Sequence, residues 1–280
     1  MNNIKTPLSY AGGKSKFLKQ LDENTPNLNN INNFYDLFLG GGSYPIFVTK
    51  KYPHLKIYVN DSNKNLINFW QILQKQSNYL IDKLINFKNN NNINDIKKIL
   101  LNLKNDKLNN NFDRAIAYYI ANKCSFAGTT ESGGFSNWNY ENKFNENNIK
   151  KLSIISNIIK YWTITNIDYK DVKIENNSFI YLDPPYKINA NLYGQNGNLH
   201  KNFNFSEFIK YSNNLKQKTI ISFNDDKIIQ NFNNYNIIKY NHTYTMNTTK
   251  KYLINQKNKK EVILRNYEVS GHRVQETSKN

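Results

Sequence analysis

One short stretch of the chain combines a carboxylate, two prolines and a tyrosine directly after an apolar segment. Residues 179–182 are apolar, and Asp183-Pro184-Pro185-Tyr186 follows them. The prolines remove two N–H donors and fix φ, so the carbonyl of Pro184 is rigidly presented. With the carboxylate of Asp183 it could hold both hydrogens of an exocyclic amino group, while Tyr186 offers a face on which an extruded base could stack. We predict a site that prepares a base nitrogen for attack on an electrophilic methyl group; the alternative is a loop with a capping aspartate.

A glycine turn is the second pattern that could do chemistry. Gly40-Gly41-Gly42 follows an expected strand at 34–38, and glycines there let a ligand approach the backbone closely. Asp61 comes 19 residues after Gly42, at the end of the next expected strand, where an acid can accept hydrogen bonds from ribose hydroxyls. Together the two features predict a site for a nucleoside cofactor. A helix-capping role is the alternative for Asp61.

A Gly-Lys-Ser sequence near the start invites comparison with a phosphate-binding P-loop. That motif requires a glycine five positions before Gly13, where this chain has Leu8, and it requires a preceding strand. ATP binding is therefore disfavoured. Tyr10 and Lys14, which flank Gly12 and Gly13, could instead cover an adenine and reach a carboxylate.

The elements that must position these residues are short strands alternating with helices. Expected strands, each ending at a turn or loop, are 34–38, 55–59, 179–182 and 219–223, with a further strand at 163–167. This alternation is typical of a mostly parallel sheet covered on both faces. The connection between the second and third main strands is too long for an ordinary loop. Its apolar spacing predicts helices within 65–84, 96–103, 113–121 and 149–159.

Composition limits the partners and the cofactors. The 280 residues carry a formal net charge of +17, which favours a polyanionic partner such as nucleic acid, although an AT-rich genome would also encode many lysines. The lone Cys124 excludes an intramolecular disulfide and a multi-cysteine zinc site, and the four histidines are scattered, so we predict no metal. We see no apolar run long enough to span a membrane and no secretory segment, and expect a cytoplasmic protein.

In order along the chain, these motifs resemble the Dam-like, D12-class adenine-N6 DNA methyltransferases of the α group. The resemblance rests on Tyr10-Ala-Gly-Gly-Lys14, Phe38-Leu-Gly-Gly-Gly42, Asn60-Asp61-Ser-Asn-Lys-Asn-Leu-Ile67, Asp183-Pro-Pro-Tyr186 and Glu261-Val-Ile-Leu-Arg-Asn266. It implies an α/β fold, with a Rossmann-like mixed, mostly parallel sheet and an inserted helical target-recognition domain. We expect the catalytic domain to comprise 1–63 and 161–280, and the recognition domain 64–160.

The resemblance also implies a cofactor and roles for named residues. S-adenosylmethionine would be the methyl donor, and Asp183, Pro184 and Tyr186 would hold the target adenine. Asp61 would bind the cofactor's ribose, and Asp183 would also touch its methionine part. Asp168 matches the position that meets its adenine, although an ordinary surface or capping acid is the alternative there. The full expected cofactor set is Tyr10, Lys14, Phe38, Gly40, Gly42, Asp61, Asp168 and Asp183.

The stretch expected to read DNA departs from part of the family. Members that recognise GATC usually carry an arginine in a stretch resembling Asn-Gly-Leu-x-Arg, whereas residues 124–136 contain none. The recognition site is therefore left open between GATC and another short adenine-containing motif. Hydroxyl and amide side chains expected to contact DNA are Ser125, Thr129, Thr130, Ser132 and Asn137, and Glu131 could add an acceptor for a base edge.

Lysines near the C-terminal end are expected to contact DNA phosphates. Lys250 and Lys251 belong to this group, for which a solvated charged sheet edge is the alternative. A segment from 187 to 194 could close over a flipped base. We expect double-stranded DNA as substrate, a possible cognate restriction endonuclease, and a monomer or weak dimer in a bacterium or virus-infected cell. The rival functions are methylation of RNA adenine or a protein amide, and non-catalytic nucleic-acid binding.

Overall fold

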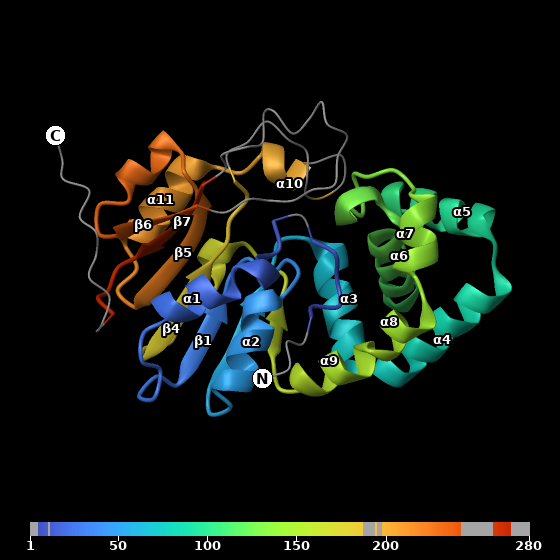
Figure 1. Cartoon of the computed structure of the whole chain (residues 1–280), viewed down its shortest axis with the longest axis horizontal. Coiled ribbons are helices and arrows are strands. Elements are labelled where there is room, and N and C mark those ends of the chain that lie inside the picture. The colour runs from blue at the N-terminus through green and yellow to red at the C-terminus, as the bar shows by residue number, and fades with distance from the viewer. Residues whose placement is uncertain (1–4, 11, 187–193, 195–197, 242–259, 270–280) are drawn as a thin grey trace.

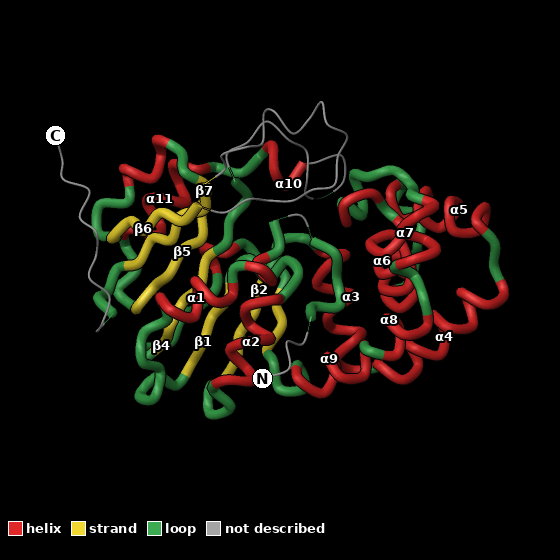
Figure 2. Tube along the Cα trace, viewed as in Figure 1, coloured by secondary structure: helices red, strands yellow, loops and turns green. Residues whose placement is uncertain are grey.

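The computed structural model describes residues 5–10, 12–186, 194, 198–241 and 260–269. Its strands form one seven-stranded sheet in the order β3-β2-β1-β4-β5-β7-β6. Strands β3, β2, β1, β4 and β5 are parallel, and β7 is antiparallel to both neighbours. Figure 2 shows the strands in yellow, with helices in red around them. The predicted mixed, mostly parallel sheet is confirmed. The strands are β1 (Asn33–Asp36), β2 (Lys56–Asn60), β3 (Thr163–Thr165), β4 (Ser178–Leu182), β5 (Lys218–Asn224), β6 (Asn236–Asn241) and β7 (Lys260–Arg265).

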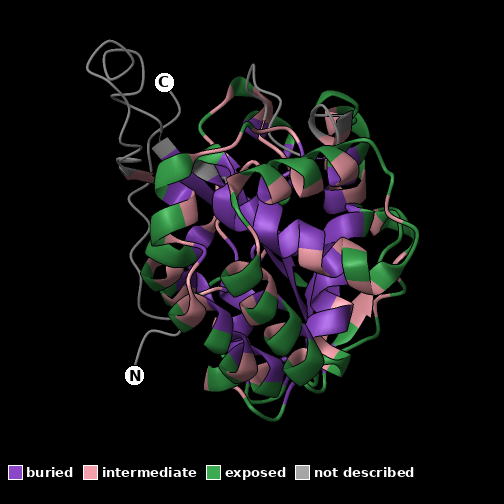
Figure 3. Cartoon of the chain, turned by 90° about the vertical axis from the view of Figure 1, so that its right-hand side faces the viewer, coloured by how far each residue is buried: buried purple, intermediate pink, exposed green. Residues whose placement is uncertain are grey.

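Both faces of the sheet are covered. Along β4, Phe179 and Tyr181 join one buried hydrophobic cluster, whereas Ile180 and Leu182 join another. Successive side chains of a strand point to opposite faces, so the two clusters are the two sides of the sheet. Helices α1 (Leu18–Asn24) and α2 (Ser43–Lys51) contribute to the first cluster, and α11 (Phe205–Asn213) contributes to the second. Figure 3 shows the buried residues in the interior of the molecule and the exposed ones around its outside.

The chain changes direction across the sheet beside β1. From β1 it runs outward through β2 to β3, and it then returns to β4 on the other side of β1. Ligand crevices of open α/β sheets lie at such a switch point, beyond the carboxyl ends of the strands. Three acids meet this edge: Asp36 ends β1, Asp61 follows β2, and Asp183 follows β4.

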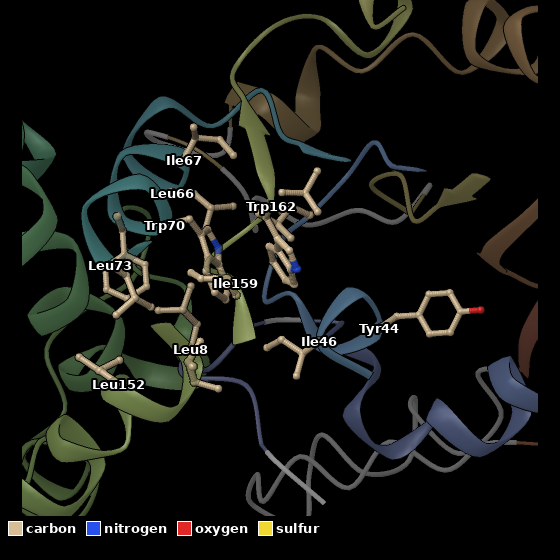
Figure 4. Close-up of a cluster of buried hydrophobic side chains, with 14 of the residues drawn as sticks. Leu8, Tyr44, Ile46, Leu66, Ile67, Trp70, Leu73, Leu152, Ile159 and Trp162 are labelled. Carbon is tan, nitrogen blue, oxygen red and sulfur yellow. The ribbon is translucent and has the colours of Figure 1, made fainter. Parts of the chain in front are cut away.

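In the sequence, a group of helices comes between β2 and β3. In space, these helices lie beside the sheet (Figure 1). In Figure 4, Leu66 and Trp70 of the first of these helices face Ile159 and Trp162, and the two tryptophan rings have centroids 6.0 Å apart. This hydrophobic cluster continues from the sheet into the helices, so the insertion is anchored by packing. The helices are α3 (Lys64–Lys75), α4 (Ser77–Asn90), α5 (Ile93–Lys104), α6 (Asn111–Cys124), α7 (Asn137–Asn142), α8 (Glu146–Lys150) and α9 (Leu152–Ile158).

Two helices expected to be continuous are interrupted. The stretch 65–84 divides at Gln76, whose φ of −137° and ψ of 36° are not helical, and the stretch 149–159 belongs to two helices that meet at Lys151. The apolar period continues across Gln76, with Leu80 and Leu84 still buried, so periodicity alone does not reveal the break. Within the described residues, no helix has the length and apolar character needed to cross a membrane.

Candidate active site

A cavity of about 470 Å³ lies at the switch point of the sheet. This volume falls within the range of about 300–1,000 Å³ found for small-ligand sites. Its walls come from the N-terminal segment, the turn after β1, the loops after β2 and β3, and the start of the loop after β4. The structure brings to this cavity every residue expected to bind the cofactor, namely Tyr10, Lys14, Phe38, Gly40, Gly42, Asp61, Asp168 and Asp183.

An ammonium group between two carboxylates marks one end of the cavity. The Nζ of Lys14 lies 2.8 Å from Oδ1 and 2.9 Å from Oδ2 of Asp183, and 3.5 Å from Oε1 of Glu261 on β7. It also donates to the carbonyl of Gly12 at 2.8 Å. Lys14 and Glu261 are buried, whereas 20% of the Asp183 side chain remains exposed. Asp183 can therefore be reached from the cavity while its charge is balanced from behind.

The acidity of Asp183 reflects this environment. Burial raises its pKa, Lys14 opposes this effect, the negative charge of Glu261 adds to it, and the resulting pKa is about 6. Asp183 is thus an ionised acceptor above about pH 6 and a neutral carboxyl below it.

Tyr186 is held by the same group of charges. Its hydroxyl donates to Oε1 of Glu261, and the Nζ of Lys14 lies 4.8 Å from the centre of its ring. Pro184 is buried, and Pro185 lines the cavity. Because its ring is fixed through the hydroxyl, Tyr186 has a defined orientation beside Asp183 before any ligand arrives.

The glycine turn closes tightly on Asp61 and Tyr10. The amide of Gly40 donates to Oδ2 of Asp61 at 3.0 Å, and the amide of Asn63 donates to Oδ1 at 2.9 Å. Gly40 has a φ of +46°, and a Cβ there would lie 2.8 Å from Cε1 of Tyr10. A glycine is required at this position both by the backbone conformation and by the close approach of the ring. Burial raises the pKa of Asp61 to about 6.

Aromatic side chains line another part of the cavity. The ring of Phe38 lies 5.2 Å from that of Tyr169 and 6.0 Å from that of Phe203. Asp168 accepts from the backbone amide of Lys170 at 3.1 Å and lies 3.4 Å from its ammonium group. Asp168 is exposed at the cavity rim, so it is both a capping acid and a lining residue.

The charges of the cavity suit a ligand with cationic groups and hydroxyls. Among the described lining residues, Lys14 is the one basic side chain, and the acidic ones are Asp36, Asp61, Asp168, Asp183 and Glu207. Burial raises the pKa of Asp36 well above its ordinary value. A sulfonium and an ammonium group would offset these carboxylates, and ribose hydroxyls could donate to Asp61. The residues present therefore fit S-adenosylmethionine.

The stretch expected to read DNA forms a compact loop, residues 125–136, hereafter the recognition loop. Thr129 and Ser132 are partly exposed, and Asn137 is exposed at the start of α7. Ser125 and Thr130 are buried and joined by a hydrogen bond of 3.0 Å from the amide of Thr130 to the hydroxyl of Ser125. Direct DNA contact stays a prediction for these five residues, and from their positions Ser125 and Thr130 would act through the shape of the loop.

Glu131 does not offer its carboxylate to a base edge, and that expectation was wrong. The residue is only 5% exposed. Its oxygens accept hydrogen bonds from the side-chain amides of Asn63 at 2.8 Å and Asn65 at 2.6 Å. The cost of burying this carboxylate is offset because both oxygens accept hydrogen bonds and because it lies beside the N-terminus of α3.

Cys124 is buried, and some of the expected residues fall outside the described part. Burial raises the pKa of the Cys124 thiol to about 12, so the thiol is protonated at neutral pH. Lys250 and Lys251 lie outside the described residues, as does most of the segment expected to close over the base; Gly194 is described, with a φ of +74°.

Glu261 is a site residue that the sequence analysis did not predict. It belongs to the motif at 261–266, for which no site role was expected. An acid at the head of the apolar run Val262-Ile-Leu264 is a usable signal, since a strand interior seldom holds a charge without a partner. Here the partners are Lys14 and Tyr186.

Comparison with known proteins agrees with the geometry. The model of the D12 class N6 adenine-specific DNA methyltransferase family matches residues 10–267. The type II methyltransferase M.MjaIII of Methanocaldococcus jannaschii is 26% identical over 81% of this chain and 78% of its own. The type II methyltransferase M1.LlaDCHI of Lactococcus lactis subsp. cremoris is 23% identical over 77% of both. The modification methylase StsI of Streptococcus sanguinis is 27% identical over 79% of this chain but 33% of its own. A match across nearly the whole chain, on a sheet whose switch point gathers the motif residues, places the protein in the family of D12 class N6 adenine-specific DNA methyltransferases.

Proposed function

We propose that this enzyme transfers a methyl group from S-adenosylmethionine to N6 of an adenine flipped out of double-stranded DNA. The observation that carries the proposal is that Asp183 shares one cavity with the glycine turn and Asp61. Asp183, which could accept hydrogen bonds from an amino group, and Asp61, which could accept them from a ribose, are thus within reach of one bound cofactor. Family membership makes adenine N6 the expected acceptor atom.

We infer that the cofactor lies along the carboxyl ends of the strands. Tyr10 and Phe38 would flank it, the amides of the glycine turn would approach it closely, and Asp61 would accept from its ribose. When bound, S-adenosylmethionine supplies a methyl group made electrophilic by a sulfonium. The protein would provide position and charge, which together supply a large part of the rate enhancement in such reactions.

The target adenine would lie against Tyr186 with its amino group at Asp183. The carboxylate of Asp183 and the carbonyl of Pro184 would accept the two amino hydrogens, which directs the nitrogen lone pair toward the methyl group. Lys14 can turn toward Glu261, 3.5 Å away, and so leave an oxygen of Asp183 for the substrate. After transfer, the extra proton on N6 can pass to that oxygen, whose pKa is about 6.

We further propose that helices α3 to α9 form the target-recognition domain, within limits close to 64 and 160, and that the recognition loop reads a short adenine-containing site. This site is either GATC or another short motif that contains adenine.

The two type II methyltransferase relatives lead us to expect a cognate restriction endonuclease as a partner. We propose a monomer or weak dimer acting in the cytoplasm, where the DNA is accessible.

Label transfer separates this proposal from its rivals. Purified protein would be incubated with tritiated S-adenosylmethionine and, in parallel, unmethylated genomic DNA, total RNA and a protein lysate. We expect label in DNA, recovered as N6-methyladenine after digestion to nucleosides. Label in RNA or protein alone would overturn the assignment of substrate.

A further inference from the structure

The recognition loop rests on two segments that also carry expected cofactor-binding residues. The first of these segments contains Ser9 and Tyr10, and Asn122 of α6 connects it to the loop. The Oδ1 of Asn122 accepts from the amide of Ser9 at 2.9 Å, and its Nδ2 donates to the carbonyl of Ser9 at 2.8 Å and to the hydroxyl of Thr130 at 3.0 Å. Gly128 approaches the same point so closely that a Cβ would lie 2.1 Å from the oxygen of Ser9. Ser9 immediately precedes Tyr10.

The second segment is the start of α3, and Glu131 of the loop connects the loop to it. Its buried carboxylate accepts from Asn63 and Asn65 at the start of α3, as described above. Asn63 is also the N-cap of α3, because its Oδ1 accepts from the amides of Asn65 and Leu66. The backbone amide of Asn63 donates to Asp61. A continuous series of hydrogen bonds therefore joins Gly40, Asp61, Asn63 and Glu131.

These two contacts have different origins in the sequence and reach the same loop. One links it to the neighbour of Tyr10, and the other links it to Asp61 through Asn63. A ligand that fixes Tyr10 and Asp61 must therefore also restrict the residues on which the loop rests. By linkage, a DNA site that fixes the loop would restrict the cofactor cavity to the same degree.

We propose that Glu131 and Asn122 are positioning residues that couple cofactor binding to the shape of the recognition loop. The inference rests on the proposed function, because it takes the cavity to be the cofactor site. Neither residue touches the reacting atoms. They set the loop for DNA once the cofactor occupies the cavity, so productive DNA binding follows cofactor binding.

Hydrogen exchange with S-adenosylhomocysteine as probe tests the coupling without DNA or catalysis. In the wild type, the probe should slow exchange at Gly40 and Asn63, and also at the loop amides of Phe126, Thr130 and Ser136 by about fivefold or more, the lower end of ordinary coupling factors. In Glu131→Gln, one asparagine amide would face an amide nitrogen in place of an acceptor. Protection at Gly40 should then persist while the response of the loop is clearly reduced, since only the contact through Asn122 remains.

Matched variants separate this role from general destabilisation. Glu141→Gln makes the same charge change at an exposed position of α7 and should leave the response of the loop intact. Asn65→Ala removes one of the two donors to Glu131, and should give an intermediate response even if Glu131→Gln folds poorly.

The outcomes distinguish the two proposals. Protection at Gly40 without any response of the wild-type loop would overturn the coupling alone. An unchanged loop response in both Glu131→Gln and Asn65→Ala would also overturn it. If the probe protected neither Gly40 nor the loop, the assignment of the cavity to the cofactor would fail, and the coupling would fail with it.

Discussion

Where Asp183 lines the cavity, one ammonium group, that of Lys14, lies within 4 Å of two carboxylates. Lys14 bonds Asp183 and lies 3.5 Å from Glu261, which in turn holds the hydroxyl of Tyr186. Removing one charged member of such a buried set leaves the charge of another without a partner. The changes in the free energy of unfolding caused by single substitutions should therefore not add up in double variants. Burial raises the pKa of Asp183 to about 6 although Lys14 opposes the shift, so its carboxyl is ionised at neutral pH.

The methylation rate should fall as the pH drops through about 6. The folded-state pKa of Asp183 is raised to about 6, so below that value the carboxyl is neutral and one oxygen becomes a donor. The single-turnover rate at saturating cofactor should then decrease about tenfold per pH unit. Saturation is needed because Asp61, also with a pKa of about 6, would otherwise contribute through cofactor binding. An acid limb near pH 4 would contradict the assignment.

Glu261→Gln should move this acid limb to lower pH. The charge of Glu261 raises the pKa of Asp183, and glutamine removes that charge while keeping an oxygen that can accept from Tyr186. Glu268→Gln, exposed on the same C-terminal segment, is the matched control and should leave the profile unchanged. A lower rate with an unmoved acid limb would show that Glu261 acts only through packing.

At the scale of elements, the turn between β1 and α2 is the most constrained part of the site. Gly42 is the N-cap residue of α2, with a φ of +71°, and a Cβ there would lie 2.9 Å from Cζ2 of Trp70. Trp70 also donates from its indole nitrogen to the carbonyl of Gly40 at 3.3 Å. The first helix of the insertion, α3, therefore supports the glycine turn directly.

Gly42→Ala should destabilise the protein by at least about 1–2 kcal/mol, the cost of a left-handed backbone for a residue with a Cβ. The contact with Trp70 adds to that cost because the ring must move. The free energy of unfolding in urea measures it. Gly134→Ala, where a Cβ meets nothing within 4 Å, should change stability by less than about 0.5 kcal/mol. Equal effects of the two substitutions would contradict this account of the turn.

Sequence reasoning located strands and motifs better than side-chain partners. Asp183 and Asp61 follow apolar strands, so the parallel sheet brings them to one edge by a general rule of the fold. The break at Gln76 was missed because the apolar period runs through it. Glu131 was assigned to DNA because a loop acid next to threonines has no visible partner in the sequence. Its partners, Asn63 and Asn65, lie more than sixty positions earlier and meet it only after folding.

At the scale of the whole molecule, charge and architecture point to DNA together. The sheet lies beside a helical insertion (Figure 1), and the cavity and the recognition loop meet where the two adjoin, through Asn63 and Ser9. A net charge of +17 adds attraction to phosphates that does not depend on sequence. Binding strength and site choice should therefore reside in different residues, with lysines contributing the former and the recognition loop the latter.

Replacing Lys250 and Lys251 together by glutamate should weaken binding to all duplexes alike. Each lysine that neutralises a phosphate contributes about one unit to the slope of log affinity against log salt, so the slope should fall by about two. Fluorescence anisotropy over a salt series, with a duplex containing the methylated motif and one lacking it, measures both effects. A loss confined to one duplex would show that these lysines read sequence.

The central claim is that Asp183, in the cavity at the switch point, directs methyl transfer to adenine N6. The most direct test is single-molecule sequencing of unmethylated genomic DNA after incubation with S-adenosylmethionine and either wild-type enzyme or Asp183→Ala. We predict N6-methyladenine at one short motif with the wild type and none above background with the variant, provided that the variant still binds S-adenosylhomocysteine. Methylation that persists in Asp183→Ala, or that appears on a base other than adenine, would contradict the account.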